Sequence, residues 1–259
     1  MVDGTTPPAP SPFRGRPVLD YAAPTPTETG TLSHRYALYF APPAGSPLAG
    51  FGARWLGRDA HTGAAVAQPA VDGVPPDRLA ALTASPRLYG FHATLKAPFR
   101  LGPGVTADGL REALAGFAAG RRSFDLRLGL RSLHGFLALM EAEPSDDLQA
   151  LADACVVEFD AFRAPMPAED RDRRAKGLDQ HHRAHLDRWG YPYVLDTFRF
   201  HMTLSERLSD GDAALLRWTL GPLAAAVCAD PIRVDAVTLF VQPREGAPFV
   251  VDGRHPFGG

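Results

Sequence analysis

Hydrophobic and polar positions alternate in some stretches of the chain and follow a helical period in others. Alternation places successive side chains on opposite faces of a strand, whereas an apolar residue every three or four positions marks one face of a helix. The pattern predicts strands at 35–40, 90–97, 199–205, 232–242 and 247–251, and a hairpin within 124–140. It predicts helices at 47–56, 77–83, 106–119, 145–162, 168–189 and 209–227. Strands interleaved with helices and hairpins indicate an α+β fold.

Residues that cap or break secondary structure set the expected boundaries. Thr106 and Ser145 each stand directly before a helical pattern, where a hydroxyl can accept a backbone N–H. Pro86 is expected to stop the helix at 77–83, and Pro98 to close the strand at 90–97. Residues 1–31 are rich in Pro, Thr, Ala and Gly without an apolar period, which predicts a flexible leader before one domain at 32–259.

Composition narrows the class of protein. Of 259 residues, 45% are hydrophobic and 22% are charged, which excludes a mainly disordered, fibrous or membrane-embedded chain. The formal net charge of −2 provides no global basic field, so no long nucleic acid is expected as a partner. The longest apolar stretch, 213–228, contains Arg217 and Pro222 and is too short to span a bilayer. With no signal-peptide pattern and only two cysteines, the sequence predicts a cytoplasmic protein without a membrane partner.

A repeated pentad is the most informative feature. Phe91-His-Ala-Thr-Leu95 recurs as Phe200-His-Met-Thr-Leu204. If both copies are strands, alternation puts the two Phe and two Leu residues on an apolar side. The same alternation puts His92, Thr94, His201 and Thr203 on the opposite side, together with Lys96 and Arg199. Two strands with polar outer faces would be the ordinary structural explanation, but β-propensity alone does not explain identical pentads.

This set of side chains suits a phosphodiester if the two strands meet. One neutral imidazole can take a proton from an attacking water or hydroxyl, and one imidazolium can give a proton to the leaving oxygen. Threonine hydroxyls can donate to the non-bridging oxygens, and Lys96 or Arg199 can offset their charge. The scheme requires no metal and no cofactor. It also predicts that the imidazoles of His92 and His201 face each other, roughly 5–8 Å apart, because each must reach an oxygen on opposite sides of one phosphorus.

The paired motifs resemble the signature of the two-histidine (2H) phosphoesterase superfamily, which includes 2′-5′ RNA ligase-like proteins and cyclic nucleotide phosphodiesterases. Further stretches are similar to one poorly characterised branch of it, the phosphonate-metabolism proteins of unknown function, at 35–43, 54–59, 88–99, 188–193, 198–204 and 239–242. The resemblance implies a bilobal fold in which two antiparallel sheets with flanking helices are related by a pseudo-two-fold around a central cleft. It also implies that His92 with Thr94 and His201 with Thr203 are the catalytic pairs.

The resulting functional hypothesis is a metal-independent phosphodiesterase acting on a cyclic phosphate or 2′-5′ phosphodiester of a nucleotide or sugar phosphate. A link to phosphonate catabolism follows only from the resemblance. The alternative is a non-catalytic protein that binds a nucleotide or phosphorylated sugar in the same cleft. Neither substrate identity nor oligomeric state follows from the sequence, nor does the choice of acid and base between the histidines.

Four residues beside the motifs are further candidates for substrate binding: Lys96, Arg199, Tyr89 and Tyr193. Core packing and solvated charge explain each of them about equally well. Separately, His181, His182 and His185 invite a metal interpretation, and His181 and His185 are one helical turn apart, so they can share a face. The sequence shows no third ligand nearby, so a solvated helix face is favoured and a metal hydrolase is the weaker alternative.

Overall fold

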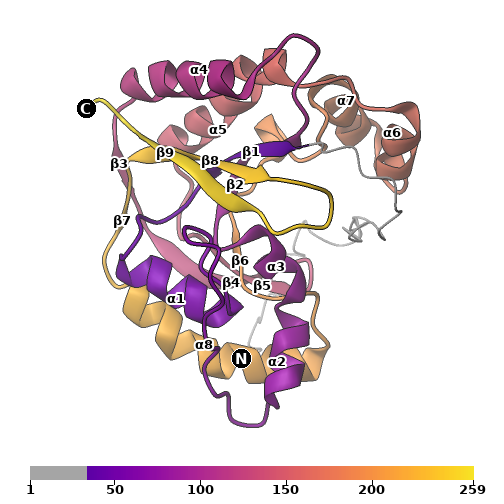
Figure 1. Ribbon diagram of the computed structural model, residues 1–259. Coiled ribbons are helices and arrows are strands. Elements are labelled where there is room, and N and C mark those ends of the chain that lie inside the picture. The colour runs from indigo at the N-terminus through magenta and orange to yellow at the C-terminus, as the bar shows by residue number, and fades with distance from the viewer. Residues whose placement is uncertain (1–33) are drawn as a thin grey trace, which may run out of the picture.

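The structure, a computed structural model, describes residues 34–259 (Figure 1). The predicted leader at 1–31 therefore lies outside the described residues. The strands are β1 (Arg35–Phe40), β2 (Ala93–Phe99), β3 (Phe124–Leu126), β4 (Leu128–Leu133), β5 (Phe136–Glu141), β6 (Met202–Thr203), β7 (Ile232–Val234), β8 (Ala236–Gln242) and β9 (Val250–Pro256). Seven of them form one antiparallel sheet in the order β4-β5-β6-β2-β1-β8-β9, and β3 pairs with β7 in a second one. The predicted α+β fold with two antiparallel sheets is confirmed.

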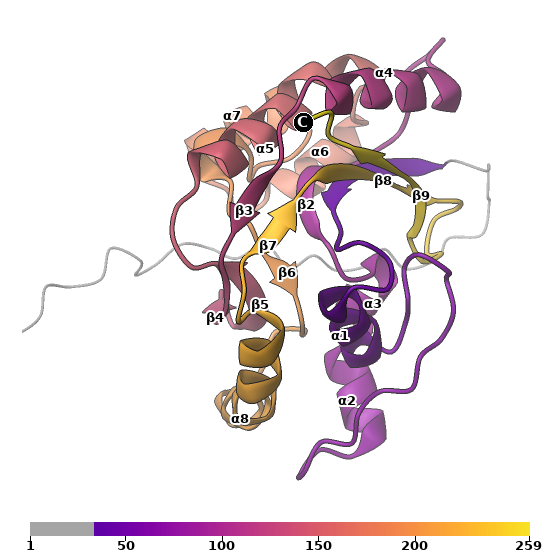
Figure 2. The ribbon, with the colours of Figure 1, turned by 90° about the vertical axis from the view of Figure 1, so that its left-hand side faces the viewer.

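Helices cover the sheet at both ends. They are α1 (Pro47–Leu56), α2 (Pro76–Leu82), α3 (Ala84–Tyr89), α4 (Ala107–Ala119), α5 (Asp146–Glu158), α6 (Ala168–Ala175), α7 (Gln180–Trp189) and α8 (Asp210–Val227), with short 3-10 helices η1 (Asp160–Phe162) and η2 (Leu195–Thr197). Helix α4 lies along β8 and β9 and α5 along β2, whereas α8 packs on β4 and β5 beside α1 (Figures 1 and 2). Within the described chain, no helix combines the length and apolar character needed to cross a bilayer.

One hydrophobic core joins the two halves of the molecule. Leu38 of β1, Leu95 of β2, Met202 of β6 and Leu139 of β5 are all buried in the same cluster. Their alternating neighbours point to the opposite face of the sheet, as the period of two requires. The two halves expected from the resemblance thus share a sheet and a core.

Helix ends match the sequence expectations where a hydroxyl cap is present. The side chains of Thr106, Ser145 and Ser209 accept hydrogen bonds from the backbone of Gly109, Leu148 and Asp212. Each bond satisfies one backbone N–H that the first helical turn leaves unpaired. These local interactions explain why α4, α5 and α8 begin where the sequence predicts.

Several predicted boundaries were wrong. Pro86 does not end the helical region but lies in the first turn of α3, where a missing N–H costs nothing. The helix expected at 168–189 is broken between α6 and α7, where Gly177 adopts a φ of 76°. The strand expected at 199–205 is paired only at Met202–Thr203, and the one expected at 90–97 runs from Ala93 to Phe99.

Helix α1 contacts both repeated segments. Gly52 lies so close to Phe91 that a Cβ there would be 2.0 Å from the ring. The indole N–H of Trp55 donates to the backbone oxygen of Leu204, 2.7 Å away. Because Phe91 precedes His92 and Leu204 ends the second pentad, α1 positions both motifs.

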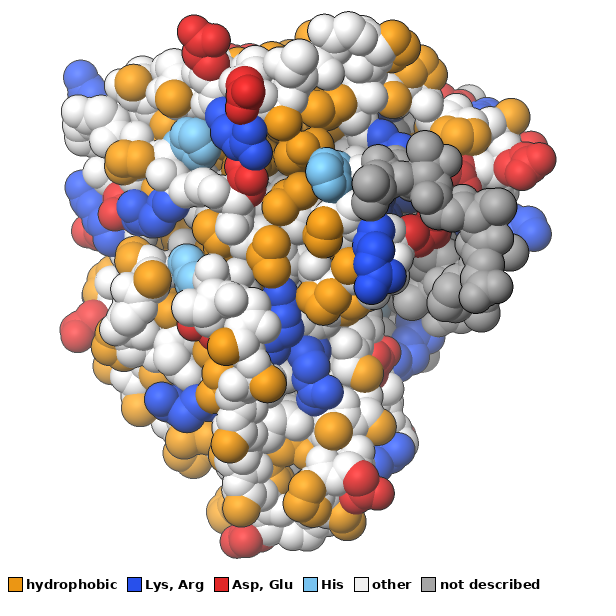
Figure 3. All heavy atoms as spheres, in the orientation of Figure 1, with side chains coloured by type: hydrophobic (Ala, Val, Ile, Leu, Met, Phe, Trp, Pro, Cys, Tyr) orange, Lys and Arg blue, Asp and Glu red, His pale blue; other side chains and the backbone are white. Residues whose placement is uncertain are grey.

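Surface charge is uneven despite the small net charge. On the face shown in Figure 3, several Lys and Arg side chains lie next to one another near the middle, among hydrophobic side chains. Local groups of this kind can attract an anion even when the chain as a whole is nearly neutral.

Candidate functional site

The two repeated segments meet at the centre of the large sheet. Strand β2 pairs with β6 through Ala93 and Met202, which are the middle residues of the two His-x-Thr motifs. A local two-fold axis between these residues therefore relates one motif to the other. Antiparallel register then places Thr203 beside His92 and His201 beside Thr94.

All four of these side chains lie on the sheet face opposite the main core. Ala93 and Met202 are buried in that core, whereas His92, Thr94, His201 and Thr203 keep partial contact with solvent. The two histidines are diagonal neighbours across the strand pair, a position at which two residues are roughly 7–8 Å apart and their Cβ atoms somewhat closer. Such a separation allows both imidazoles to reach one small group held between them.

Both imidazoles are anchored in the same way. His92 Nδ1 lies 2.8 Å from the backbone oxygen of Gly90, and His201 Nδ1 lies 2.7 Å from that of Arg199. A carbonyl oxygen only accepts, so each Nδ1 carries the proton and donates it. This leaves Nε2 of each neutral ring as a proton acceptor on the other side of the ring. Thr94 Oγ1 lies 3.3 Å from Nε2 of His92.

The surroundings disfavour a positive charge on either imidazole. The pKa of His92 is lowered to about 4, mainly by desolvation; the hydrogen bond to Gly90 opposes this effect and a charge on His201 reinforces it. Desolvation also lowers the pKa of His201, and His134 adds to that effect. Although both rings have some solvent contact, dense protein around them excludes most water. Both are therefore neutral at neutral pH in the ligand-free site.

Aromatic rings from three neighbouring elements surround His92. Tyr39 of β1 stacks on it with ring centroids 3.7 Å apart and planes at 24°. Phe240 of β8 and Tyr89 of α3 lie at 6.0 and 6.3 Å. Tyr89 is a candidate from the sequence, whereas Tyr39 is not, although the alternation in β1 puts the buried Tyr39 on the same face as Thr94, with which it pairs in register.

A second histidine accompanies His201. His134 occupies the tight turn between β4 and β5 with a φ of 49°, followed by Gly135 at 90°. Positive φ at both positions is the geometry of a two-residue hairpin turn. Phe136, directly after this turn, has its ring centroid 5.7 Å from that of His201, so the turn lies near the second motif, and His134 helps to lower the pKa of His201. No motif in the sequence links His134 to His201.

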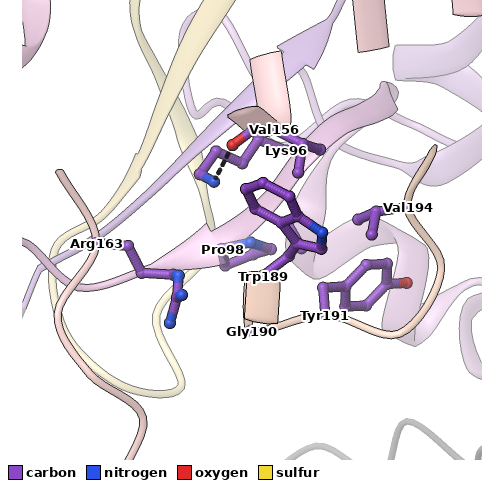
Figure 4. Close-up of a pocket in the computed structure, with 9 residues that line it drawn as sticks. Lys96, Pro98, Val156, Arg163, Trp189, Gly190, Tyr191 and Val194 are labelled. Atoms are coloured by element: carbon purple, nitrogen blue, oxygen red, sulfur yellow. Dashed lines mark hydrogen bonds between the residues drawn. The ribbon is translucent and has the colours of Figure 1, made fainter. Parts of the chain in front are cut away.

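The structure corrects the expected position of Lys96. A β-bulge shifts the register, so that Lys96 pairs with Leu38 of the core face instead of continuing the His92 face. Its Nζ donates to the backbone oxygen of Val156 in α5 (Figure 4). The same atom lies 3.6 Å from Asp160. The adjoining cavity, lined partly by Trp189, measures about 10 Å³, which is room for no more than one water. Desolvation lowers the pKa of Lys96 to about 8.

The other two candidates occupy different positions. Arg199 is exposed, two residues before His201, and its guanidinium donates to the backbone oxygen of Phe198. Tyr193 packs against His182 of α7 with ring centroids 5.2 Å apart. Arg199 thus remains beside the second motif, whereas Tyr193 belongs to the surroundings of α7.

Helix α7 brings together a second group of side chains. His182 and His185 are buried, so the helix is not the fully solvated face that the sequence favoured. His181 and His185 lie beside Asp196 of η2, and the ligand atoms of the three residues are all within 4.8 Å of one another. Asp196 is the third group that the sequence analysis did not find.

The fold and the paired motifs define an α+β protein with two histidines and two threonines related by a local two-fold. The chain belongs to the family described as "Protein of unknown function (DUF1045)", whose model matches residues 94–250. The family match confirms the resemblance, predicted from the sequence, to a group of proteins of unknown function.

Two curated relatives carry the same name, ribose 1,5-bisphosphate phosphokinase PhnN. The protein from Janthinobacterium sp. (strain Marseille) is 42% identical over 253 residues, covering 94% of this chain and 56% of that protein. The one from Laribacter hongkongensis (strain HLHK9) is 36% identical over 216 residues, covering 83% of this chain and 50% of that protein. The chain thus spans about half the length of these relatives.

Among solved structures, that of E. coli LigT complexed with NADP+ aligns with 88% of this chain and 100% of that one, at 17% identity and a TM-score of 0.36. This similarity is too weak to bear on function.

Proposed function

We propose that this chain is a phosphodiesterase that uses His92 and His201 as its proton-transfer groups and needs no metal for that chemistry. Its substrate would carry a cyclic phosphate or a 2′-5′ phosphodiester on a nucleotide or sugar phosphate. The observation that carries the proposal is the pairing of Ala93 with Met202, because it places two identical His-x-Thr arrangements around one point.

The proposed reaction is a displacement at phosphorus. A water oxygen forms a new P–O bond while Nε2 of one neutral imidazole takes its proton. The P–O bond to the leaving oxygen breaks, and the imidazolium on the other side gives that oxygen a proton. One P–O bond is formed and one is broken, and exchange with solvent restores the two protonation states. Thr94 and Thr203 would donate to the non-bridging oxygens.

The negative charge of the substrate would produce the imidazolium that the reaction needs. In the ligand-free site both imidazoles have lowered pKa values, so neither is ready to act as an acid at neutral pH. A phosphate anion held between them favours the charged form of an imidazole and raises its pKa. The acid would therefore be generated when substrate binds. Arg199 would offset part of the phosphate charge from the second motif.

The curated relatives favour a phosphorylated ribose as the substrate class. Their printed name refers to ribose 1,5-bisphosphate, and this chain aligns with about half of each of them. The name does not assign kinase activity to this half, because the sequence lacks the Gly-x-x-x-x-Gly-Lys-Ser/Thr loop that cradles nucleotide phosphates. We therefore propose cyclic ribose phosphates as candidate substrates together with cyclic nucleotides. A role in phosphonate catabolism is part of the same proposal.

The test is a hydrolysis screen of 2′,3′-cyclic nucleotides, cyclic ribose phosphates and short 2′-5′ oligonucleotides in excess EDTA. Wild-type protein is expected to turn over at least one of them. His92→Ala and His201→Ala should each lower the rate by about 10² or more. Thr94→Val should lower it as well, whereas Thr94→Ser, which keeps the hydroxyl, is the matched control and should retain most activity.

Two outcomes would decide against the proposal. Full activity in both histidine variants would show that the paired imidazoles are not the catalytic groups. Ligand-induced stabilisation without turnover across the whole panel would favour the second candidate, a binding protein. Burial lowers the pKa of both imidazoles, which supports this candidate because neither ring then has a proton ready for a leaving oxygen at neutral pH.

A further inference from the structure

Helix α7 and η2 bring three potential metal ligands together. His181 and His185 are four residues apart on α7, with ring centroids 4.5 Å apart. Asp196 approaches them from η2, with Oδ2 2.7 Å from His181 Nε2 and Oδ1 3.3 Å from His185 Nε2. The carboxylate thus offers one oxygen to each imidazole.

The orientation of the His185 ring is set by Thr197. Its Nδ1 lies 3.4 Å from Thr197 Oγ1, and the single proton of that hydroxyl is directed to the backbone oxygens of Val194 and Pro192. The hydroxyl therefore presents lone pairs to the ring, and His185 Nδ1 donates to it. The Nε2 of His185 then faces the Asp196 carboxylate. A cation shared by the carboxylate and the two imidazole nitrogens, whether a proton or a metal ion, stabilises this close approach.

The backbone holds Asp196 in this position. Leu195 has a φ of 54°, a left-handed conformation that is unfavourable for a residue with a side chain. Gln149 of α5 donates to the backbone oxygen of Leu195 and fixes it there. His185 is buried, whereas His181 and Asp196 are 56% and 65% exposed at their side chains. The group is therefore preformed on one side and open to solvent on the other.

We propose that His181, His185 and Asp196 bind one divalent first-row transition metal ion, with zinc as the simplest occupant. Two imidazoles and a carboxylate suit such an ion better than Mg²⁺ or Ca²⁺, which take mainly oxygen ligands. Three protein ligands leave a position for water or an anion. The hydrogen bond between Thr197 and His185 is the kind of outer contact that orients a metal-binding imidazole.

The site would join two parts of the fold. Asp196 lies five residues before His201, in the segment that enters β6, whereas both histidines belong to α7. A bound ion would fasten α7 to the chain leading into the second motif. This role is separate from the proton transfer proposed for His92 and His201, which uses no metal.

The experiment is metal titration of the full chain after removal of any affinity tag and of adventitious metal. Calorimetry with Zn²⁺ and the visible absorption of added Co²⁺ are expected to show one equivalent bound, and Zn²⁺ should raise the melting temperature. His181→Ala and Asp196→Asn should each weaken binding at least about tenfold. Both replace exposed side chains, so folding should survive. His34→Ala, which removes an exposed imidazole outside the group, is the matched control and should bind like wild type.

Absence of saturable binding of both ions would overturn the inference, and so would equal affinity in wild type, His181→Ala and Asp196→Asn. Because the readouts are stoichiometry and spectrum, the outcome does not depend on finding a substrate. His92→Ala should keep full metal binding, which separates a failure of this inference from a failure of the proposed function.

Discussion

Replacing Gly52 by alanine would test how α1 positions the first motif. A Cβ at this position would lie 2.0 Å from Phe91 Cδ1 and 2.7 Å from Phe91 Cβ, so a turn of the ring alone does not remove the clash. Phe91 is buried and meets Phe51 edge to face at 6.0 Å. Overpacking of this kind costs about 1–3 kcal/mol, offset by up to about 1 kcal/mol that alanine gains over glycine in a helix. We expect Gly52→Ala to destabilise the fold by about 1–2 kcal/mol.

Gly50 provides a matched control on the same helix. A Cβ there would meet only the Arg54 guanidinium, at an ordinary contact distance of 3.6 Å. Gly50→Ala should therefore stabilise the protein by about 0.5–1 kcal/mol. The two variants should differ by about 2 kcal/mol, or roughly 4–8 °C in melting temperature for a chain of this size.

The assay is thermal unfolding followed by circular dichroism, combined with kcat/KM on the substrate that the hydrolysis screen identifies. Because Phe91 directly precedes His92, a displaced ring should also lower kcat/KM in Gly52→Ala and leave it unchanged in Gly50→Ala. A melting temperature for Gly52→Ala equal to or above that of Gly50→Ala would refute the close packing of α1 on the first motif.

Two further predictions concern charge. The pH dependence of kcat/KM should be bell-shaped, because kcat/KM reports the pKa values of the free enzyme. The rate should rise with pH near 4, where His92 loses its proton, and fall again below pH 6.5, where His201 loses its proton. A kcat/KM that still rises above pH 7 would contradict the lowered pKa values. Lys96→Met should leave kcat/KM unchanged, because the Lys96 ammonium is bound to Val156 and Asp160 beneath α5 and Asp160 keeps its contacts with Arg163 and Arg188. A large rise in KM for Lys96→Met would restore Lys96 as a substrate-binding residue.

The sequence predicted those elements whose signals are local. The strand at 35–40 and the helix at 47–56 have the predicted bounds, and Thr106 and Ser145 cap their helices as expected. Alternation and hydroxyl capping act within a few residues, so a single chain segment contains the necessary information. Boundaries failed where a proline or glycine permitted more than one local structure, as at Pro86 and Gly177.

Long-range register decided which candidate residues share a face. Alternation alone put Lys96 beside His92 and Thr94, but the bulge in β2 turned it towards α5. A bulge depends on the partner strand, and its effect is to exchange the faces of all later residues. No signal within residues 90–97 gives the position at which β1 and β2 lose their regular pairing.

By itself, the repeated pentad determined that two strands each present an imidazole and a hydroxyl opposite an apolar side. Only the tertiary structure decided that these strands are neighbours, with Ala93 opposite Met202, and that Asp196 reaches the two histidines of α7. The physical reason is that side-chain alternation is a property of one strand. The meeting of distant segments depends instead on how the shared core packs, which is a property of the whole chain.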